Sequence, residues 1–345
     1  MDPLTQIRLT RELIDIDSTT GREQDAARFI ASTLGTLGYD VTEQPVGDGR
    51  FNVLARLGDP HVVFSTHFDC VPPFFPGSEE HGRLYGRGSC DAKGTLVAQI
   101  AAAERLRASG ETRVGLLFVV GEERGSDGAK AANEAASGSR FLINGEPTDN
   151  RLGAATRGVY RARLIARGRA AHSSLPALGI SAIDKLVNAL VALRDVQWPA
   201  DPDLGETFYT VGLISGGIAP NVIPPEAEAE MMFRTVGPHD PLRQLIEAHA
   251  GQWVAVEDVL VVPPVRMQTM DGFDSAVFSF TTDIPFLDRW GAPLLLGPGS
   301  VMVAHTADEH VAIAELHRAV DLYERLARML LTRGAPDQPQ GAPDL

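Results

Sequence analysis

The chain has 345 residues, 44% of them hydrophobic and 22% charged, which is typical of a folded globular protein long enough for two domains. Its 45 acidic and 31 basic residues give a net charge of −14, which disfavours nucleic acid or an anionic membrane as the main partner. The chain shows no signal peptide and no apolar run long enough to span a membrane, so a cytoplasmic location is expected by default.

The first part of the chain alternates between helical and strand-like patterns. Apolar residues at helical spacing predict helices over 3–16 and 23–37, with Thr20 and Gly21 at the entry to the second. Further strands are predicted at 51–57, 62–66, 114–120 and 141–143, and further helices at 93–108 and 126–137. The continuous apolar run at 114–120 is typical of a strand buried on both faces. This alternation predicts an α/β fold with a mostly parallel sheet.

A different pattern begins near residue 157. Strands are predicted at 159–167, 207–215, 226–235 and 254–262, and helices at 178–194 and 238–249. This β-α-β-β-α-β order predicts a ferredoxin-like α+β domain with antiparallel strands. A strand at 293–296 and a long helix at 312–331 then resume the first pattern.

This return to the first pattern predicts that one domain is inserted into the other. The first domain would be discontinuous, formed by residues 1–156 and 265–345, and the inserted domain would comprise residues 157–264. The proline-rich tail from Gly334 is expected to be frayed.

Five short clusters of metal-binding residue types lie at the ends of apolar runs or in the loops beside them. They contain His67 and Asp69, Asp91, Glu122 and Glu123, Glu146, and His305. Open α/β sheets build their sites at such strand ends. Each cluster alone is a weak signal, because a single histidine is usually an ordinary core or surface residue and Asp91 is equally well explained as a helix cap. Together, however, the imidazole and carboxylate groups form a ligand set that zinc accepts.

The sequence resembles the dinuclear zinc aminoacylase and carboxypeptidase family over essentially the whole chain. This family includes acetylornithine deacetylase, acetyl-lysine deacetylase, succinyl-diaminopimelate desuccinylase and glutamate carboxypeptidase. The resemblance rests on His67-x-Asp69, Gly86-Arg-Gly-Ser-Cys-Asp91-Ala-Lys-Gly94, Glu122-Glu123, Gly145-Glu146-Pro-Thr148 and Ala304-His305-Thr-x-Asp308-Glu309. It implies a catalytic domain of zinc-peptidase type, with the inserted domain serving for dimerisation and as a lid.

The resemblance also implies a ligand set for two Zn²⁺ ions, for which Co²⁺ would be able to substitute. His67 and Glu146 would each bind one ion, and Glu123 and His305 would bind the other. Asp91 would bridge the two ions, since a carboxylate has two oxygens to offer.

Three further residues are implied to be catalytic. Glu122 would take a proton from water and pass it to the leaving amine. Asp69 would accept the other ring N–H of His67 and so fix its tautomer. His172 would stabilise the developing oxyanion in the site of a partner subunit, which implies a homodimer.

The expected substrate is a small-molecule N-acyl amino acid. In the inserted domain, Asn221 belongs to a loop similar to the family's substrate loop, and Arg234 is a candidate partner for the substrate carboxylate, although a surface ion pair explains Arg234 equally well. A cysteine nucleophile at Cys70 or Cys90 is disfavoured, because free cysteine is commonly a small buried apolar residue.

The leading expectation is the deacetylation of N-acetyl-L-ornithine, a step of arginine biosynthesis. Deacylation of N-acetyl-lysine, N-acetylcitrulline or succinyl-diaminopimelate remains open, as does a metallo-dipeptidase or carboxypeptidase. A non-catalytic, metal-stabilised binding protein is the alternative from a different class.

Overall fold

The computed structural model describes residues 1–136 and 138–333, and the chain divides into two compact units. Among the described residues, unit 1 is formed by Met1–Ala154, Met267–Ala276 and the chain from Thr282 to Arg333, and unit 2 by Ala155–Arg266 and Val277–Thr281. The sequence places the divisions at 156/157 and 264/265, and it does not predict that Val277–Thr281 joins the second unit. The predicted helix end at residue 137 and the tail from residue 334 lie outside the described residues.

A six-stranded sheet forms the centre of unit 1, in the order β1-β2-β6-β3-β7-β17. Its strands are β1 (Asp40–Gly47), β2 (Arg50–Arg56), β3 (Val62–His67), β6 (Val114–Val119), β7 (Phe141–Asn144) and β17 (Ala292–Leu295). Within this sheet β2 alone runs against the other strands. The predicted α/β fold with a mostly parallel sheet is therefore confirmed. The sequence does not predict β1, because this edge strand is mostly exposed and carries few apolar residues.

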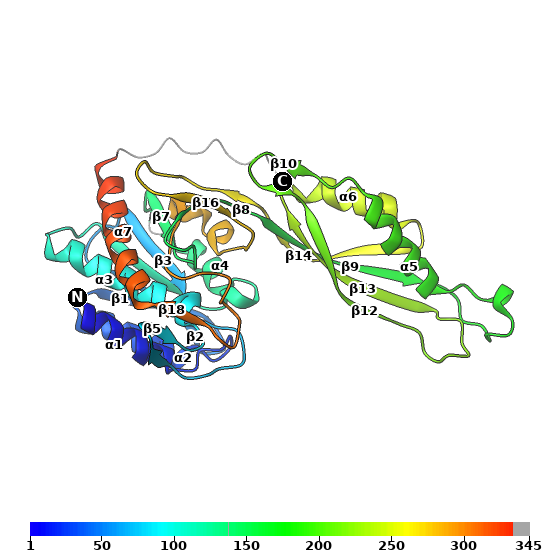
Figure 1. Ribbon diagram of the computed structural model, residues 1–345, viewed down its shortest axis with the longest axis horizontal. Helices are drawn as coiled ribbons and strands as arrows, with labels where there is room; N and C mark the ends of the chain where they lie inside the picture. Colours follow the sequence, from blue (N-terminus) through cyan, green and yellow to red (C-terminus); the bar gives the residue numbers. More distant parts are fainter. Residues whose placement is uncertain (137, 334–345) are drawn as a thin grey trace. The chain divides into compact units, whose positions relative to one another are not determined.

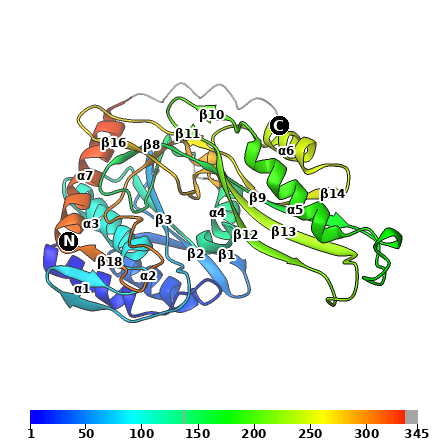
Figure 2. The ribbon, with the colours of Figure 1, turned by 45° about the vertical axis from the view of Figure 1, so that its right-hand side comes forward.

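Helices cover both faces of the sheet, and Figure 2 shows α3 and α7 side by side on one of them. The helices of unit 1 are α1 (Pro3–Ile14), α2 (Gln24–Thr36), α3 (Gly94–Ala108), α4 (Asp127–Glu134) and α7 (Ile313–Thr332). Phe64 shares a core with α1, α2, α3 and α7, whereas its neighbour Val63 shares a core with α4. Successive side chains of a strand point to opposite faces, so both faces of the sheet are buried. No helix among the described residues is long and apolar enough to cross a membrane.

Further strands form two three-stranded sheets and one hairpin, none of which the sequence pattern predicts. The sheets are β18 (His310–Ala312), β5 (Arg83–Tyr85) and β4 (Ser78–Glu80), and β15 (Val265–Arg266), β8 (Leu152–Thr156) and β16 (Ser275–Phe278). The hairpin is formed by β10 (Ala200–Asp201) and β11 (Gly205–Glu206). The antiparallel pairing of β18 with β5 brings the chain near His305 beside the chain that leads to Asp91.

Unit 2 is an antiparallel sheet with two helices side by side on one face (Figure 1). Its main elements are β9 (Gly158–Arg167), α5 (Ala182–Ala192), β12 (Phe208–Gly216), β13 (Glu226–Thr235), α6 (His239–Ala250) and β14 (Val254–Val262). The sheet order is β12-β13-β9-β14, and every pairing is antiparallel. Tyr160, Ala162 and Leu164 of β9 are buried under the helices, while Arg161 on the other face pairs with Glu230. This arrangement confirms the predicted ferredoxin-like fold.

Candidate metal centre

The five predicted metal ligands come together in unit 1, where the parallel strands end. His67 is the last residue of β3, Glu123 lies in the turn after β6, and Glu146 follows β7. Asp91 lies in the loop that leads into α3, and His305 lies in the loop between β17 and β18. Because the carboxyl ends of parallel strands meet at one edge of a sheet, residues far apart in the chain become neighbours.

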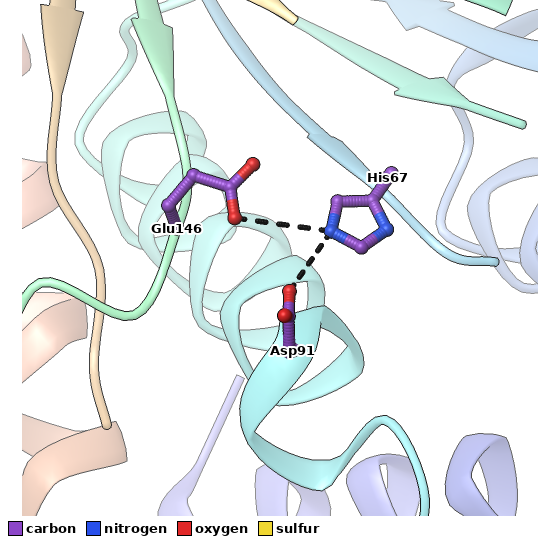
Figure 3. A group of neighbouring side chains, drawn as sticks. All are labelled: His67, Asp91 and Glu146. Atoms are coloured by element: carbon purple, nitrogen blue, oxygen red, sulfur yellow. Dashed lines mark hydrogen bonds and ion pairs between the residues drawn. The ribbon is translucent and has the colours of Figure 1, made fainter. Parts of the chain in front are cut away.

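His67, Asp91 and Glu146 form the first group of candidate ligands (Figure 3). The Nε2 atom of His67 lies 3.0 Å from Oδ1 of Asp91 and 3.8 Å from Oε2 of Glu146. Burial raises the pKa of Glu146 to about 8, although His67 opposes this shift. The Oε1 atom of Glu146 has no hydrogen-bond partner among the described residues. A buried carboxylate oxygen without a partner is costly, and a cation at this position would satisfy it.

Asp91, Glu123 and His305 form the second group. The Nε2 atom of His305 lies 2.9 Å from Oε1 of Glu123 and 3.2 Å from Oδ2 of Asp91. Asp91 therefore directs one oxygen to each group, as a carboxylate that bridges two metal ions does. His305 has a φ angle of +62°, which is uncommon for a residue other than glycine and is often found at functional sites.

The charges of the two groups fit divalent cations. Burial raises the pKa of Glu123. Burial alone would also raise the pKa of Asp91, but hydrogen bonds from His305 and His67 hold it below its usual range. Hydrogen bonds to Asp91 and Glu123 in turn raise the pKa of His305 to about 10. Protons and cations thus compete for the same atoms, and the mixed imidazole and carboxylate donors suit Zn²⁺ or Co²⁺.

Metal binding is expected to release protons and to weaken as the pH falls. Glu146, with a pKa of about 8, and His305, with a pKa of about 10, both hold a proton at neutral pH unless a cation replaces it. Each proton released should raise the apparent Kd by about tenfold per unit decrease in pH. Calorimetric titration of Zn²⁺ in buffers of different ionisation enthalpy measures this number of protons. A Kd that does not change with pH would contradict the assignment.

Glu122 precedes the candidate ligand Glu123, and neither group of candidate ligands among the described residues includes it. Burial raises the pKa of Glu122 well above its ordinary value. His67 opposes this shift, while the carboxylates of Glu146 and Asp283 add to it. A carboxylate that binds a proton readily and is not a ligand is suited to proton transfer.

Asp69 contacts His67 through its backbone as well as its side chain. The Nδ1 atom of His67 lies 3.1 Å from the carbonyl oxygen of Asp69 and 3.4 Å from its Oδ1 atom. A carbonyl oxygen only accepts, so Nδ1 carries a hydrogen. Burial lowers the pKa of His67, but hydrogen bonds to Asp69, Asp91 and Glu146 raise it well above its ordinary value, so Nε2 also holds a proton that a cation would replace. The carboxylate of Asp69 also accepts the backbone N–H groups of Glu122 at 3.0 Å and Glu123 at 3.2 Å.

Two buried acidic residues near the centre have no role in the sequence-based prediction. Glu309 pairs with Arg87 at 2.6 Å and accepts the N–H groups of Cys90 and Asp91 at 3.2 and 3.1 Å, so it orients the backbone at Asp91. Its place in the motif that contains His305 is a signal that could have found it. Asp283 is also buried, and burial raises its pKa to about 7. No sequence pattern marks Asp283.

Cys70 and Cys90 are poor candidates for a nucleophile. Both are buried, and burial raises the pKa of Cys70 to about 11 and that of Cys90 well above its ordinary value. The reactive form of cysteine is the thiolate, and these side chains stay protonated at neutral pH.

His172 and Asn221 lie on adjacent loops of unit 2. Their segments are joined by a bridge between His172 and Val222 and by a 3.0 Å hydrogen bond from the N–H of Ser173 to the carbonyl of Asn221. The side chain of His172 is exposed, and its Nδ1 atom accepts the N–H of Ser174 at 3.2 Å. The neutral ring therefore carries its hydrogen on Nε2, which is free to donate to an oxyanion.

Arg234 lies at the other end of the same sheet. Strand β13 starts at Glu226, shortly after Asn221, and Arg234 is the eighth residue after Glu226, about 26 Å along the strand. One subunit therefore cannot present Asn221 and Arg234 to the same small carboxylate. Arg234 is partly buried, and this burial lowers the pKa of its guanidinium. A guanidinium in such a position is suited to binding a carboxylate of a ligand.

Similarities to known proteins extend over most of the chain. The family model for peptidase family M20/M25/M40 matches residues 63–329. A peptidase M20 domain-containing protein of Schizosaccharomyces pombe is 36% identical over 333 residues, which cover 93% of this chain and 83% of that protein. A probable carboxypeptidase of Aspergillus fumigatus is 34% identical over 380 residues, covering 94% and 86%. The crystal structure of aminopeptidase PepT from Bacillus cereus shares the fold, with a TM-score of 0.79 and 20% identity over 96% of this chain and all of that one.

Proposed function

Because the chain belongs to peptidase family M20/M25/M40, we propose that it is a dinuclear zinc hydrolase of amide bonds that lie next to a free carboxylate. The observation that carries this proposal is the pair of ligand groups that share Asp91, with Glu122 beside them as a non-ligand carboxylate. A non-catalytic metal-binding protein would need neither a bridging arrangement nor this additional carboxylate.

The ligand set divides between the two ions. His67 and Glu146 would hold one Zn²⁺ ion, Glu123 and His305 would hold the other, and Asp91 would contribute to both. When bound, the two ions would lower the pKa of a water molecule and polarise the scissile carbonyl. Asp69 keeps the Nε2 lone pair of His67 directed at the first group through the contacts of Nδ1.

Glu122 carries the proton in this reaction. It accepts a proton from the attacking water as the bond between the water oxygen and the carbonyl carbon forms. It then donates this proton to the nitrogen as the carbon–nitrogen bond breaks, which yields a carboxylic acid and a free amine. The Nε2 hydrogen of His172 stabilises the negative oxygen between these two steps.

The proposed substrates are N-acyl amino acids, with N-acetyl-L-ornithine as the first candidate. The partly buried Arg234 supports a substrate with a carboxylate next to the cleaved amide. A C-terminal peptide bond has the same feature, and the similarity to a probable carboxypeptidase favours this second candidate. The preference for the ornithine side chain rests on the sequence resemblance alone.

Substrates that lack the free carboxylate are expected to react poorly. Amidation of this group should lower kcat/KM by about ten- to a hundredfold, because it removes a charge-assisted hydrogen bond. The test compares acetylated ornithine, lysine, citrulline, methionine and glutamate with succinyl-diaminopimelate and a dipeptide, each as the acid and as the amide. In an Arg234→Gln variant, amidation should have little further effect. A dipeptide that reacts at least about tenfold faster than every acyl amino acid would overturn the deacylase assignment and leave the metallopeptidase.

We also propose that the protein forms a homodimer through unit 2. Among the described residues, strand β12 is an edge of the sheet and pairs with β13 alone. Helix α5 packs over the neighbouring strands β13 and β9. The exposed large apolar side chains of these two elements are Phe208, Val211, Leu213 and Ile214 of β12 and Ile183, Val187 and Val191 of α5. An exposed apolar edge strand is a template for pairing, and the same surface on a second copy satisfies it through a two-fold axis. The proposed dimer would let His172 serve the partner's metal centre.

Mixing two inactive variants should therefore restore activity. In a hybrid of Glu122→Ala and His172→Ala subunits, the centre that keeps Glu122 receives the intact His172 of the other subunit. Random subunit exchange makes half of the dimers hybrids with one active site of two, so about a quarter of the wild-type activity is expected. The measurement is turnover after exchange, with exchange itself followed by native mass spectrometry. Complete exchange without recovery would show that His172 does not act across the dimer.

A further inference from the structure

The carboxylate of Asp69 receives a hydrogen bond that the sequence does not predict. Asp69 is fully buried, and its Oδ2 atom accepts the hydroxyl hydrogen of Thr20 at 2.9 Å. The same oxygen accepts the N–H of Glu123, while Oδ1 accepts the N–H of Glu122. The orientation of this one carboxylate therefore sets the backbone position of a metal ligand and of the proton carrier.

Thr20 is held in place by its own backbone. Its N–H donates to the carbonyl of Cys70 at 3.1 Å, and the N–H of Cys70 donates to Ser18 at 3.1 Å. The N–H of Arg22 closes a turn onto Thr19 at 2.7 Å. Within this turn Gly21 has a φ angle of +98°, a conformation that favours glycine. The sequence predicts a helix from residue 23 with Thr20 at its entry, and α2 begins at Gln24.

A buried ion pair supports the turn from its other side. The carboxylate of Glu23 is fully buried, accepts the N–H of Gly21 at 2.7 Å and pairs with Arg50 at 3.3 Å. Arg50 also pairs with Asp127, the first residue of α4, at 3.3 Å. The position of the Thr20 hydroxyl thus follows from contacts that do not involve the metal ligands.

We propose that Thr20 is a positioning residue of the metal centre, acting through Asp69 on the turn that carries Glu122 and Glu123. Without the hydroxyl, Oδ2 of Asp69 keeps the N–H of Glu123 as its donor, and the carboxylate is held less firmly against the two backbone N–H groups. A buried carboxylate that loses a partner reorients to recover one. The common acceptor of the Glu122 and Glu123 N–H groups is then less well fixed.

Three variants isolate this hydrogen bond. Thr20→Val keeps the shape of the side chain and removes the hydroxyl, whereas Thr20→Ser retains the hydroxyl. Thr19→Val is the matched control, because the hydroxyl of Thr19 donates to Asp17 at 2.6 Å and not to Asp69. All three are measured in the full-length protein, together with their thermal unfolding.

Hydrogen–deuterium exchange reads the positioning directly and requires neither metal nor turnover. In Thr20→Val, the amides of Glu122 and Glu123 should exchange roughly five- to tenfold faster than in the wild type, because their acceptor is less well fixed. In the zinc-loaded enzyme, the same variant should lower kcat by about tenfold with KM unchanged, as is typical when a partner of a metal ligand is lost. Thr20→Ser should restore both quantities, and Thr19→Val should change neither.

Amide exchange and kinetics together separate this inference from the proposed function. Only the kinetic measurement rests on the proposed function. Wild-type protein that hydrolyses no amide refutes the proposed function, while the exchange of the Glu122 and Glu123 amides still decides the role of Thr20. Unchanged exchange in Thr20→Val, or an equal change in Thr19→Val, overturns the inference. A rise in KM at constant kcat would also overturn it, since it would place Thr20 in substrate binding.

Discussion

A Glu122→Gln variant should keep its fold and both metal ions and lose nearly all turnover. The substitution preserves the shape of the side chain and removes only its ability to carry a proton. Loss of general acid–base catalysis typically costs about 10²- to 10⁴-fold in kcat. The backbone N–H of Glu122 continues to donate to Asp69, so the neighbouring turn is expected to stay in place.

Glu123→Gln is the matched control for this variant, because it makes the same chemical change one residue further along the chain. Glu123 approaches His305 at 2.9 Å within the second ligand group, so its substitution should lower metal content as well as activity. Metal analysis and kinetics are measured on the same preparations. Metal loss in Glu122→Gln, with metal retained in Glu123→Gln, would reverse the two assignments.

An Asp91→Ala variant should lose both metal ions and at least about a thousandfold in kcat/KM, since the Lewis-acid contribution of several kcal/mol disappears. Asp91 is the one residue shared by the two ligand groups, with Oδ1 at 3.0 Å from His67 and Oδ2 at 3.2 Å from His305. Its removal therefore weakens both positions at once. Metal content after dialysis and the Kd for added Zn²⁺ are the measurements.

His305→Ala provides the comparison for Asp91→Ala. It removes a ligand of the second group only, so it should retain more metal than Asp91→Ala and bind one ion at the first group. Equal metal content in the two variants would show that Asp91 does not bridge. Addition of excess Zn²⁺ or Co²⁺ should restore more activity to His305→Ala than to Asp91→Ala.

The long helices and strands and the candidate ligand residues were predictable from the sequence, because both depend on local patterns of residues. The uninterrupted apolar run of β6 and the helical spacing of α7 depend only on neighbours in the chain. The pattern missed β1 and the shortest strands, since an exposed edge strand needs few apolar residues and a strand of two or three residues shows no periodicity. The burial of Asp283 was also not predictable from the sequence, because it depends on the packing of segments distant in sequence.

The sequence by itself determined which residues are able to bind a metal, and that they follow strands whose ends meet at one edge of a sheet. Only the tertiary structure decided how these residues divide into two ligand groups. The packing around Asp91 directs its two oxygens to different histidines, and the length of β13 places Arg234 far from Asn221. Asp69 likewise links Thr20 to Glu122 across about a hundred residues through a single carboxylate. Hydrogen bonds between distant segments leave no periodic trace in a sequence, because their geometry arises only when the sheet and its loops have packed.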